Sequence, residues 1–128
     1  MKSIFKLALC LSLLSGCTKN SGPLLDNGAP SIAIFAPTIG AILTPGQPFP
    51  LRVSLTELQE IHFYRVVLHS PSTGFDVTLK NEHLDAVNFE IDEMVTMPNL
   101  QPGAYKLEVI ANDHNGNSNK ASVEVILE

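Results

Sequence analysis

Four histidines are the residues best suited to metal chemistry, and their spacing decides whether they could share an ion. His62 and His69 lie seven residues apart on one predicted strand, and an odd offset points side chains to opposite faces. His83 and His114 stand alone, and no Cys/His pair has zinc-finger spacing. We therefore expect solvent-exposed histidines near strand ends and no metal site.

Oxygen ligands cluster in one segment near the C-terminus, where Asp113, Asn115 and Asn117 surround Gly116. A calcium loop of the EF-hand type needs its glycine at the sixth position and a closing glutamate, and this segment has neither. An Asn-Gly pair suits a hairpin turn, because such turns need residues at positive φ. We expect a turn here. The alternative is a ligand- or calcium-binding module that uses two loops, which correspond to the B–C and F–G loops of Ig-like domains and are expected at about Thr56–Glu60 and Asp113–Asn119.

No arrangement of side chains in the sequence pairs a nucleophile with a base. Serines and threonines fall in predicted turns and outer faces, without a G-x-S-x-G motif or a glycine-rich phosphate loop. The carboxylates are dispersed. The sequence therefore predicts that the protein is not an enzyme and has no cofactor.

Cys17 is the residue with the clearest chemical role. It follows a start that carries Lys2 and Lys6, an apolar run from Leu7 to Leu14, and two small residues. The run is too short to span a bilayer, which takes about 20 apolar residues, and it has the pattern of a secretory signal. Leu14-Ser15-Gly16-Cys17 resembles the lipobox of bacterial lipoproteins. The resemblance implies cleavage before Cys17 and attachment of lipid to its thiol.

These features divide the chain into a signal peptide (1–16), a lipidated cysteine with a flexible tether (17–30) and one domain (31–128). Thr18 stands where an aspartate would retain a lipoprotein in the inner membrane, so the resemblance implies the outer membrane. No acidic run follows Cys17, which favours the periplasmic face over the cell surface. Similar short lipoproteins are common in the Bacteroidetes, in families of unknown function.

The charge of the domain argues against nucleic acid as a partner. All 13 acidic residues follow Cys17, whereas Lys2 and Lys6 would be removed with the signal peptide, so the mature net charge is −7. No basic stripe is present to neutralise phosphates. The only other cysteine, Cys10, would also be removed, and the domain must fold without a disulfide.

The domain shows period-two alternation, which predicts strands with one buried face. Seven or so such segments, separated by Gly, Pro and Asn turns, indicate an all-β antiparallel sandwich. The segments begin at about Ser31, Phe49, Ile61, Phe75, Val87, Tyr105 and Ala121.

Two stretches resemble immunoglobulin-like and fibronectin-type-III modules. The run from Leu100 to Val109 resembles the start of their penultimate strand, and Ala111 to Asn117 is similar to a hairpin of bacterial Ig-like domains. The resemblance implies the fold and no activity. It also implies that Tyr105 forms a tyrosine corner, with its ring in the core and its hydroxyl on a nearby backbone group.

An apolar outer face is the candidate interaction surface. If Tyr64, Val66 and Leu68 point inward, then the residues facing outward on the same and neighbouring strands include Phe63, Val67, Ile110 and Ile126. A contiguous patch of this kind indicates a partner. The expected function is that of a noncatalytic binding or structural module, anchored in the cell envelope, with an envelope protein or glycan as its partner.

Overall fold

The computed structural model describes residues 28–128. The predicted signal peptide, Cys17 and most of the tether lie outside the described residues. Within residues 28–128 there is no helix long and apolar enough to cross a membrane.

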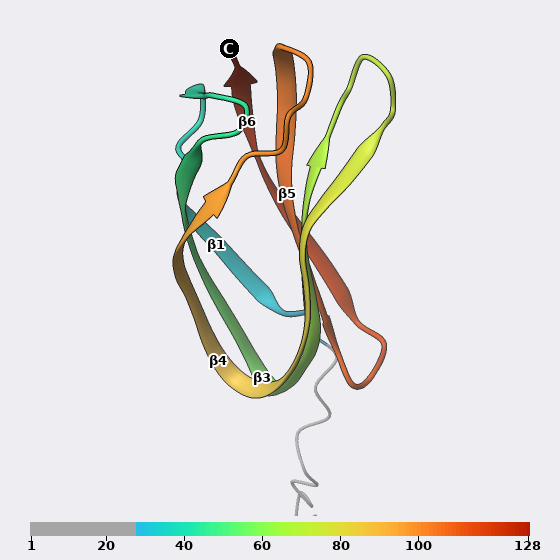
Figure 1. Ribbon diagram of the computed structural model, residues 1–128. Helices are drawn as coiled ribbons and strands as arrows, with labels where there is room; N and C mark the ends of the chain where they lie inside the picture. The colour runs from blue at the N-terminus through green and yellow to red at the C-terminus, as the bar shows by residue number, and fades with distance from the viewer. Residues whose placement is uncertain (1–27) are drawn as a thin grey trace, which may run out of the picture.

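The described chain is all-β, as its alternation predicts, and its strands form one continuous sheet that curls on itself (Figure 1). Six strands are present where about seven were expected. They are β1 (Ser31–Ala36), β2 (Ala41–Leu43), β3 (Pro48–His69), β4 (Asp76–Thr96), β5 (Gly103–Asp113) and β6 (Ser118–Leu127).

The count is lower because β3 and β4 are long and each takes part in two regions of the sheet. The first half of β3 pairs with β1 and with the second half of β4, up to Thr56. From Ile61 onward, β3 pairs with β5 and with the first half of β4. The loop expected at Thr56–Glu60 is therefore absent, because the strand continues through it.

The curled sheet encloses a single hydrophobic core. Leu51, Val53 and Leu55 of β3 are fully buried, and the residues between them are exposed or half-buried. β5 supplies the facing layer with its own alternating set, which includes Leu107 and Val109. The period-two pattern thus places apolar side chains on one face of each strand, and burial of that face stabilises the sheet.

The two ends of the domain differ in what they hold (Figure 1). At one end, the Asn119 side-chain amide donates to the carbonyl oxygen of Pro30 at 2.9 Å, just before β1. The same end holds the bend of β3, where the Gln59 side chain accepts from that of Asn115 in the β5–β6 turn at 2.8 Å. We call this the tether end. The distal end holds the β3–β4 turn, the loops around β2 and the C-terminus.

Candidate metal centre

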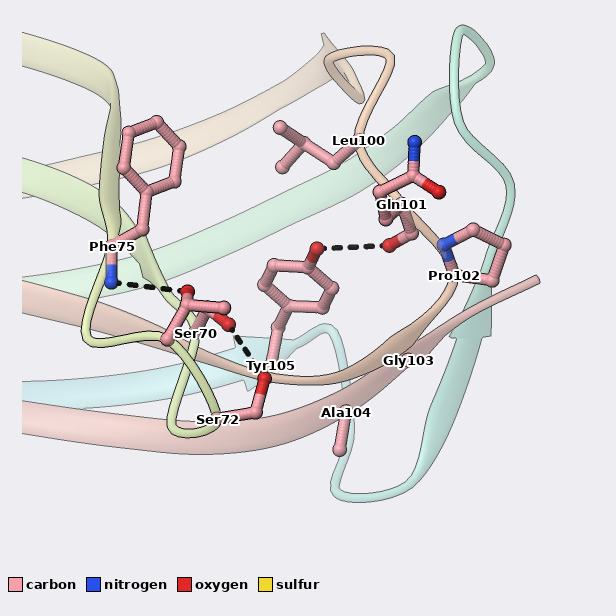
Figure 2. Close-up of a pocket in the computed structure, with 10 residues that line it drawn as sticks. Ser70, Ser72, Phe75, Leu100, Gln101, Pro102, Gly103, Ala104 and Tyr105 are labelled. Carbon is pink, nitrogen blue, oxygen red and sulfur yellow. Dashed lines mark hydrogen bonds between the residues drawn. The ribbon is translucent and has the colours of Figure 1, made fainter.

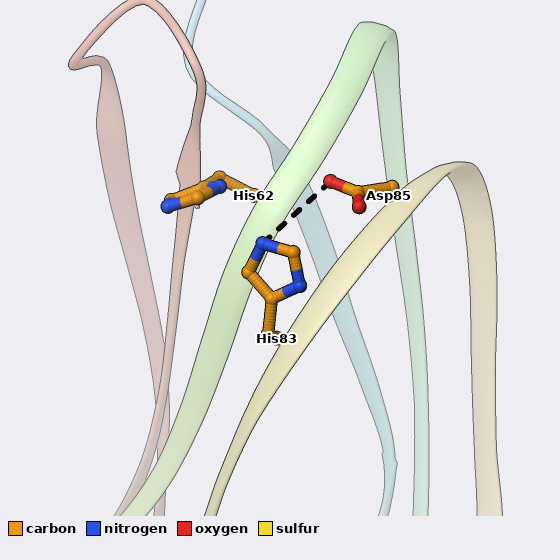
Figure 3. Close-up of side chains that lie close together, drawn as sticks. All are labelled: His62, His83 and Asp85. Atoms are coloured by element: carbon orange, nitrogen blue, oxygen red, sulfur yellow. Dashed lines mark ion pairs between the residues drawn. The ribbon is translucent and has the colours of Figure 1, made fainter.

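Three imidazoles and a carboxylate meet at the tether end. The His62 ring lies 4.7 Å from the His83 ring and 4.3 Å from the His114 ring, centroid to centroid. An oxygen of Asp85 lies 3.7 Å from Nε2 of His83 and 3.0 Å from Nε2 of His114. Figure 3 shows His62 and the pair His83–Asp85, which come from neighbouring strands.

A β-bulge places His62 in this cluster. The ladders that β3 forms with β4 and with β5 both shift register between Ile61 and Phe63. Ile61 and Tyr64 are both buried, so His62 and Phe63 lie together between two core residues. Bulges re-aim side chains in this way and are frequent beside functional sites.

His83 and Asp85 reach the cluster from one side of β4, at the point where its ladder with β3 shifts register. They lie two residues apart on β4, and both are exposed while the residue between them is half-buried. Side chains at this spacing project from the same face of a strand. His114 comes from the turn between β5 and β6.

The cluster contains two groups that could hold a metal ion, and they share Asp85. One consists of His62, His83 and Asp85, and the other of Glu60, Asp85 and His114. In each group the ligand atoms lie within 4.8 Å of one another. Imidazole and carboxylate together suit divalent transition metals.

One nitrogen of His62 is left without a polar partner. Its Nδ1 atom is shielded from solvent and has no hydrogen bond within the described part of the chain. A buried polar atom without a partner costs about 1–3 kcal/mol and calls for an explanation. The ring is held by packing, including an edge contact with Phe63 at 5.4 Å between centroids.

Asp113, the residue of the calcium hypothesis, is engaged by its own turn. Its carboxylate accepts from the backbone N–H groups of Asn115 and Asn117, each at 2.8 Å, and from the Asn117 side chain at 2.7 Å. Burial raises the pKa of this carboxyl, but the hydrogen bonds outweigh burial and hold its pKa below the usual value. The geometry is that of a turn stabilised by an aspartate.

Separate, solvent-exposed histidines were expected from their spacing, and the structure corrects this for three of them. His69 is separate: it pairs with Asp76 at 2.6 Å, next to the distal turn. The convergence of His62, His83 and His114 depends on strand pairing and on the bulge. Neither the strand pairing nor the bulge can be predicted from the spacing of the histidines along the sequence.

The apolar face expected from Phe63, Val67, Ile110 and Ile126 is not a continuous exposed surface. Val67 is only 3% exposed, and Phe63 and Ile110 are half-buried. Ile126 is exposed, at 41%. Neighbouring side chains on the sheet therefore cover much of this face.

Exposed apolar side chains gather instead at the distal end. A hollow of about 390 Å³ lies beside Tyr105 and is lined by Phe75 and Leu100, among others (Figure 2). A second hollow, of about 250 Å³, is also lined in part by Tyr105, together with Ile39 and Ile126.

Comparisons with known proteins show the fold alone. No protein-family model and no curated protein matches the chain. Among solved structures, superoxide reductase (neelaredoxin) from Ignicoccus hospitalis is similar over 79% of this chain and 81% of its own, with a TM-score of 0.53 and 15% identity. The fibronectin(III)-like modules of Clostridium thermocellum CbhA are similar over 77% of this chain and 46% of theirs, with a TM-score of 0.52 and 14% identity.

The prediction that the protein is not an enzyme is contradicted by these findings. It rested on a sandwich without catalytic motifs, yet superoxide reductase, an enzyme, shares the fold. The described residues also contain two groups of potential metal ligands that no motif in the sequence indicates. A motif search along the sequence misses a site that is assembled from separate strands.

Proposed function

We propose that this protein is a lipid-anchored component of the bacterial outer membrane, held through Cys17, whose Ig-like domain presents its distal end to a partner protein in the periplasm. If each half of β3 and β4 is counted as a separate strand, these two bent strands contribute four strands. With β1, β5 and β6 they make an Ig-like sandwich of about seven strands. The small β2 adds to one edge beside β6.

The position of Pro30 carries this proposal. The chain reaches β1 at the tether end, where Asn119 binds the Pro30 carbonyl. Residues 18–30 include two Gly, two Asn and two Pro, and a flexible tether of that length, as expected from the sequence, would span about 20 Å root-mean-square. Lipid on Cys17 would therefore keep the tether end near the headgroups and turn the distal end away from the membrane.

The chemistry of the distal end favours a protein partner over a glycan. Ile39 is 78% exposed, and Phe75 and Ile126 are also exposed there. The two hollows beside Tyr105 have mainly apolar linings. Burial of exposed apolar surface is what protein interfaces provide at their centres.

Metabolic labelling with an alkyne-bearing fatty acid tests the anchor. The wild-type protein should be labelled and should sediment with outer membranes, whereas Cys17→Ala should be unlabelled and leave that fraction. Cys10→Ala is the matched control, because it removes the other cysteine from the signal segment and should be labelled like wild type. Equal labelling of Cys17→Ala and wild type would refute the anchor.

A further inference from the structure

We infer that His62, His83 and Asp85 bind one divalent transition-metal ion of the zinc class at the tether end. Two imidazole nitrogens and one carboxylate oxygen form this ligand set. Calcium and magnesium prefer sites made of oxygen ligands alone, so the two nitrogens select against them. This inference goes beyond the anchoring function and does not depend on it.

The three ligand atoms lie near one another, although farther apart than around a bound ion. With metal–ligand bonds of about 2.0–2.1 Å, neighbouring ligands of a tetrahedral ion lie about 3.3 Å apart. Nε2 of His83 and the Asp85 oxygen are 3.7 Å apart, and the three ligand atoms lie within 4.8 Å of one another. Small side-chain rotations would close these distances. Three protein ligands leave a fourth position open to water or another small ligand.

The surroundings hold two of the three ligands in place. His62 lies in the bulge between buried residues and packs against Phe63, and no hydrogen bond within the described chain engages its Nδ1 atom. The Asp85 carboxylate accepts a hydrogen bond from Nε2 of the His114 imidazole at 3.0 Å. His114 is therefore a positioning residue for the carboxylate, and such outer contacts orient metal ligands.

The alternative group, which contains Glu60 and His114, is the weaker candidate. All three of its members are exposed, and it offers a single imidazole. Because both groups need Asp85, we assign one ion, held by the group that contains two imidazoles and the partly buried His62.

Calorimetric titration of the purified protein tests the site. The protein as it is purified from cells, in detergent micelles and without an oligohistidine tag, is titrated with ZnCl2, and separately with MgCl2 and CaCl2. We expect one zinc ion per chain and no binding of magnesium or calcium. Zinc should also raise the melting temperature, because an ion that binds the folded state alone stabilises it.

Matched variants locate the ion. His83→Ala and Asp85→Asn should each weaken zinc binding by more than about tenfold, because each removes a ligand. These side chains are 60% and 56% exposed, so the fold should survive, and circular dichroism checks this. His69→Ala is the control, since His69 also contacts a carboxylate but lies near the distal turn. It should bind zinc like wild type.

Three results would overturn the inference: no zinc binding by folded wild-type protein, an equal loss in His69→Ala, or a loss in Glu60→Gln with His83→Ala binding zinc like wild type. The last would place the ion in the other group. Cys17→Ala protein should bind zinc normally, so a failed anchor and a failed metal site give different results.

Discussion

Tyr105 donates a hydrogen bond from its hydroxyl to the backbone carbonyl of Gln101, four residues earlier, at 2.8 Å. The ring is 9% exposed and packs in the core at the start of β5. This confirms the tyrosine corner expected from the resemblance to Ig-like modules. It also fixes the loop before β5, which lines one hollow of the distal end (Figure 2).

Two replacements of Tyr105 should separate the contribution of the ring to stability from that of the hydroxyl. Tyr105→Phe keeps the ring and loses the hydrogen bond, at a cost of about 1 kcal/mol. Tyr105→Ala also empties part of the core and should cost about 3–5 kcal/mol. Urea denaturation measures both free energies of unfolding. Equal losses in the two variants would show that the ring contributes nothing to packing.

Asp113 should make the domain sensitive to acid. Its pKa is lowered in the folded state, so its contribution to stability is present above the unfolded value of about 3.8 and is lost as the pH falls below it. Asp113→Asn should lower the free energy of unfolding at pH 7 by about 1–3 kcal/mol, because the amide cannot accept all three hydrogen bonds. The variant should also lose part of the decline in stability that wild type shows as the pH falls below about 3.8. A decline as steep as that of wild type would contradict this assignment.

Lys80 joins the two halves of β4. Its ammonium group contacts Glu93 at 2.6 Å and Glu82 at 3.0 Å, and its side chain is only 16% exposed. The hydrogen bond from Lys80 is the largest cause that lowers the pKa of Glu82, followed by the one from Tyr64. Lys80→Met should therefore raise the Glu82 pKa toward its usual value, as carboxyl carbon shifts in an NMR titration would show. An unchanged Glu82 titration would mean that Lys80 does not contact it in solution.

Much of the fold could be predicted from the sequence because alternation reports burial directly. Leu51, Val53 and Leu55 lie in the core as their spacing indicates, and so does Tyr105. The continuity of β3 could not be predicted in this way. Thr56–Glu60 contains polar residues typical of a loop, but the strand continues through them, and its ladder with β4 shifts register between Thr56 and Ile61.

The metal centre could not be predicted for a related reason. Alternation assumes an uninterrupted strand, and the bulge between Ile61 and Phe63 breaks that assumption at His62. The partners of His62 then depend on the register of β3 against β4, which no local pattern specifies. The prediction that Val67 is exposed was wrong for a different reason. Its place in the alternation puts it on the outward face of the strand, but neighbouring side chains cover it.

The last prediction concerns which end of the domain meets the proposed partner. Ile39 at the distal end and Leu58 in the bend of β3 at the tether end are 78% and 77% exposed. The two residues are therefore a matched pair, equal in exposure and similar in size. Neither belongs to the core, so a change to aspartate at either site should leave the fold intact.

If the tether holds the bend close to the membrane, a partner from the periplasm reaches Ile39 first. Ile39→Asp should then lower recovery of cross-linked envelope proteins severalfold, because a charge is buried in an apolar contact. Leu58→Asp should leave recovery at the wild-type level. Both variants are expressed with the lipobox intact, cross-linked in cells and purified from membranes, and labelling with the fatty acid confirms equal anchoring. Loss of recovery in Leu58→Asp alone would show that the tether end binds the partner. Recovery of glycan in place of protein would show that the partner belongs to the other class.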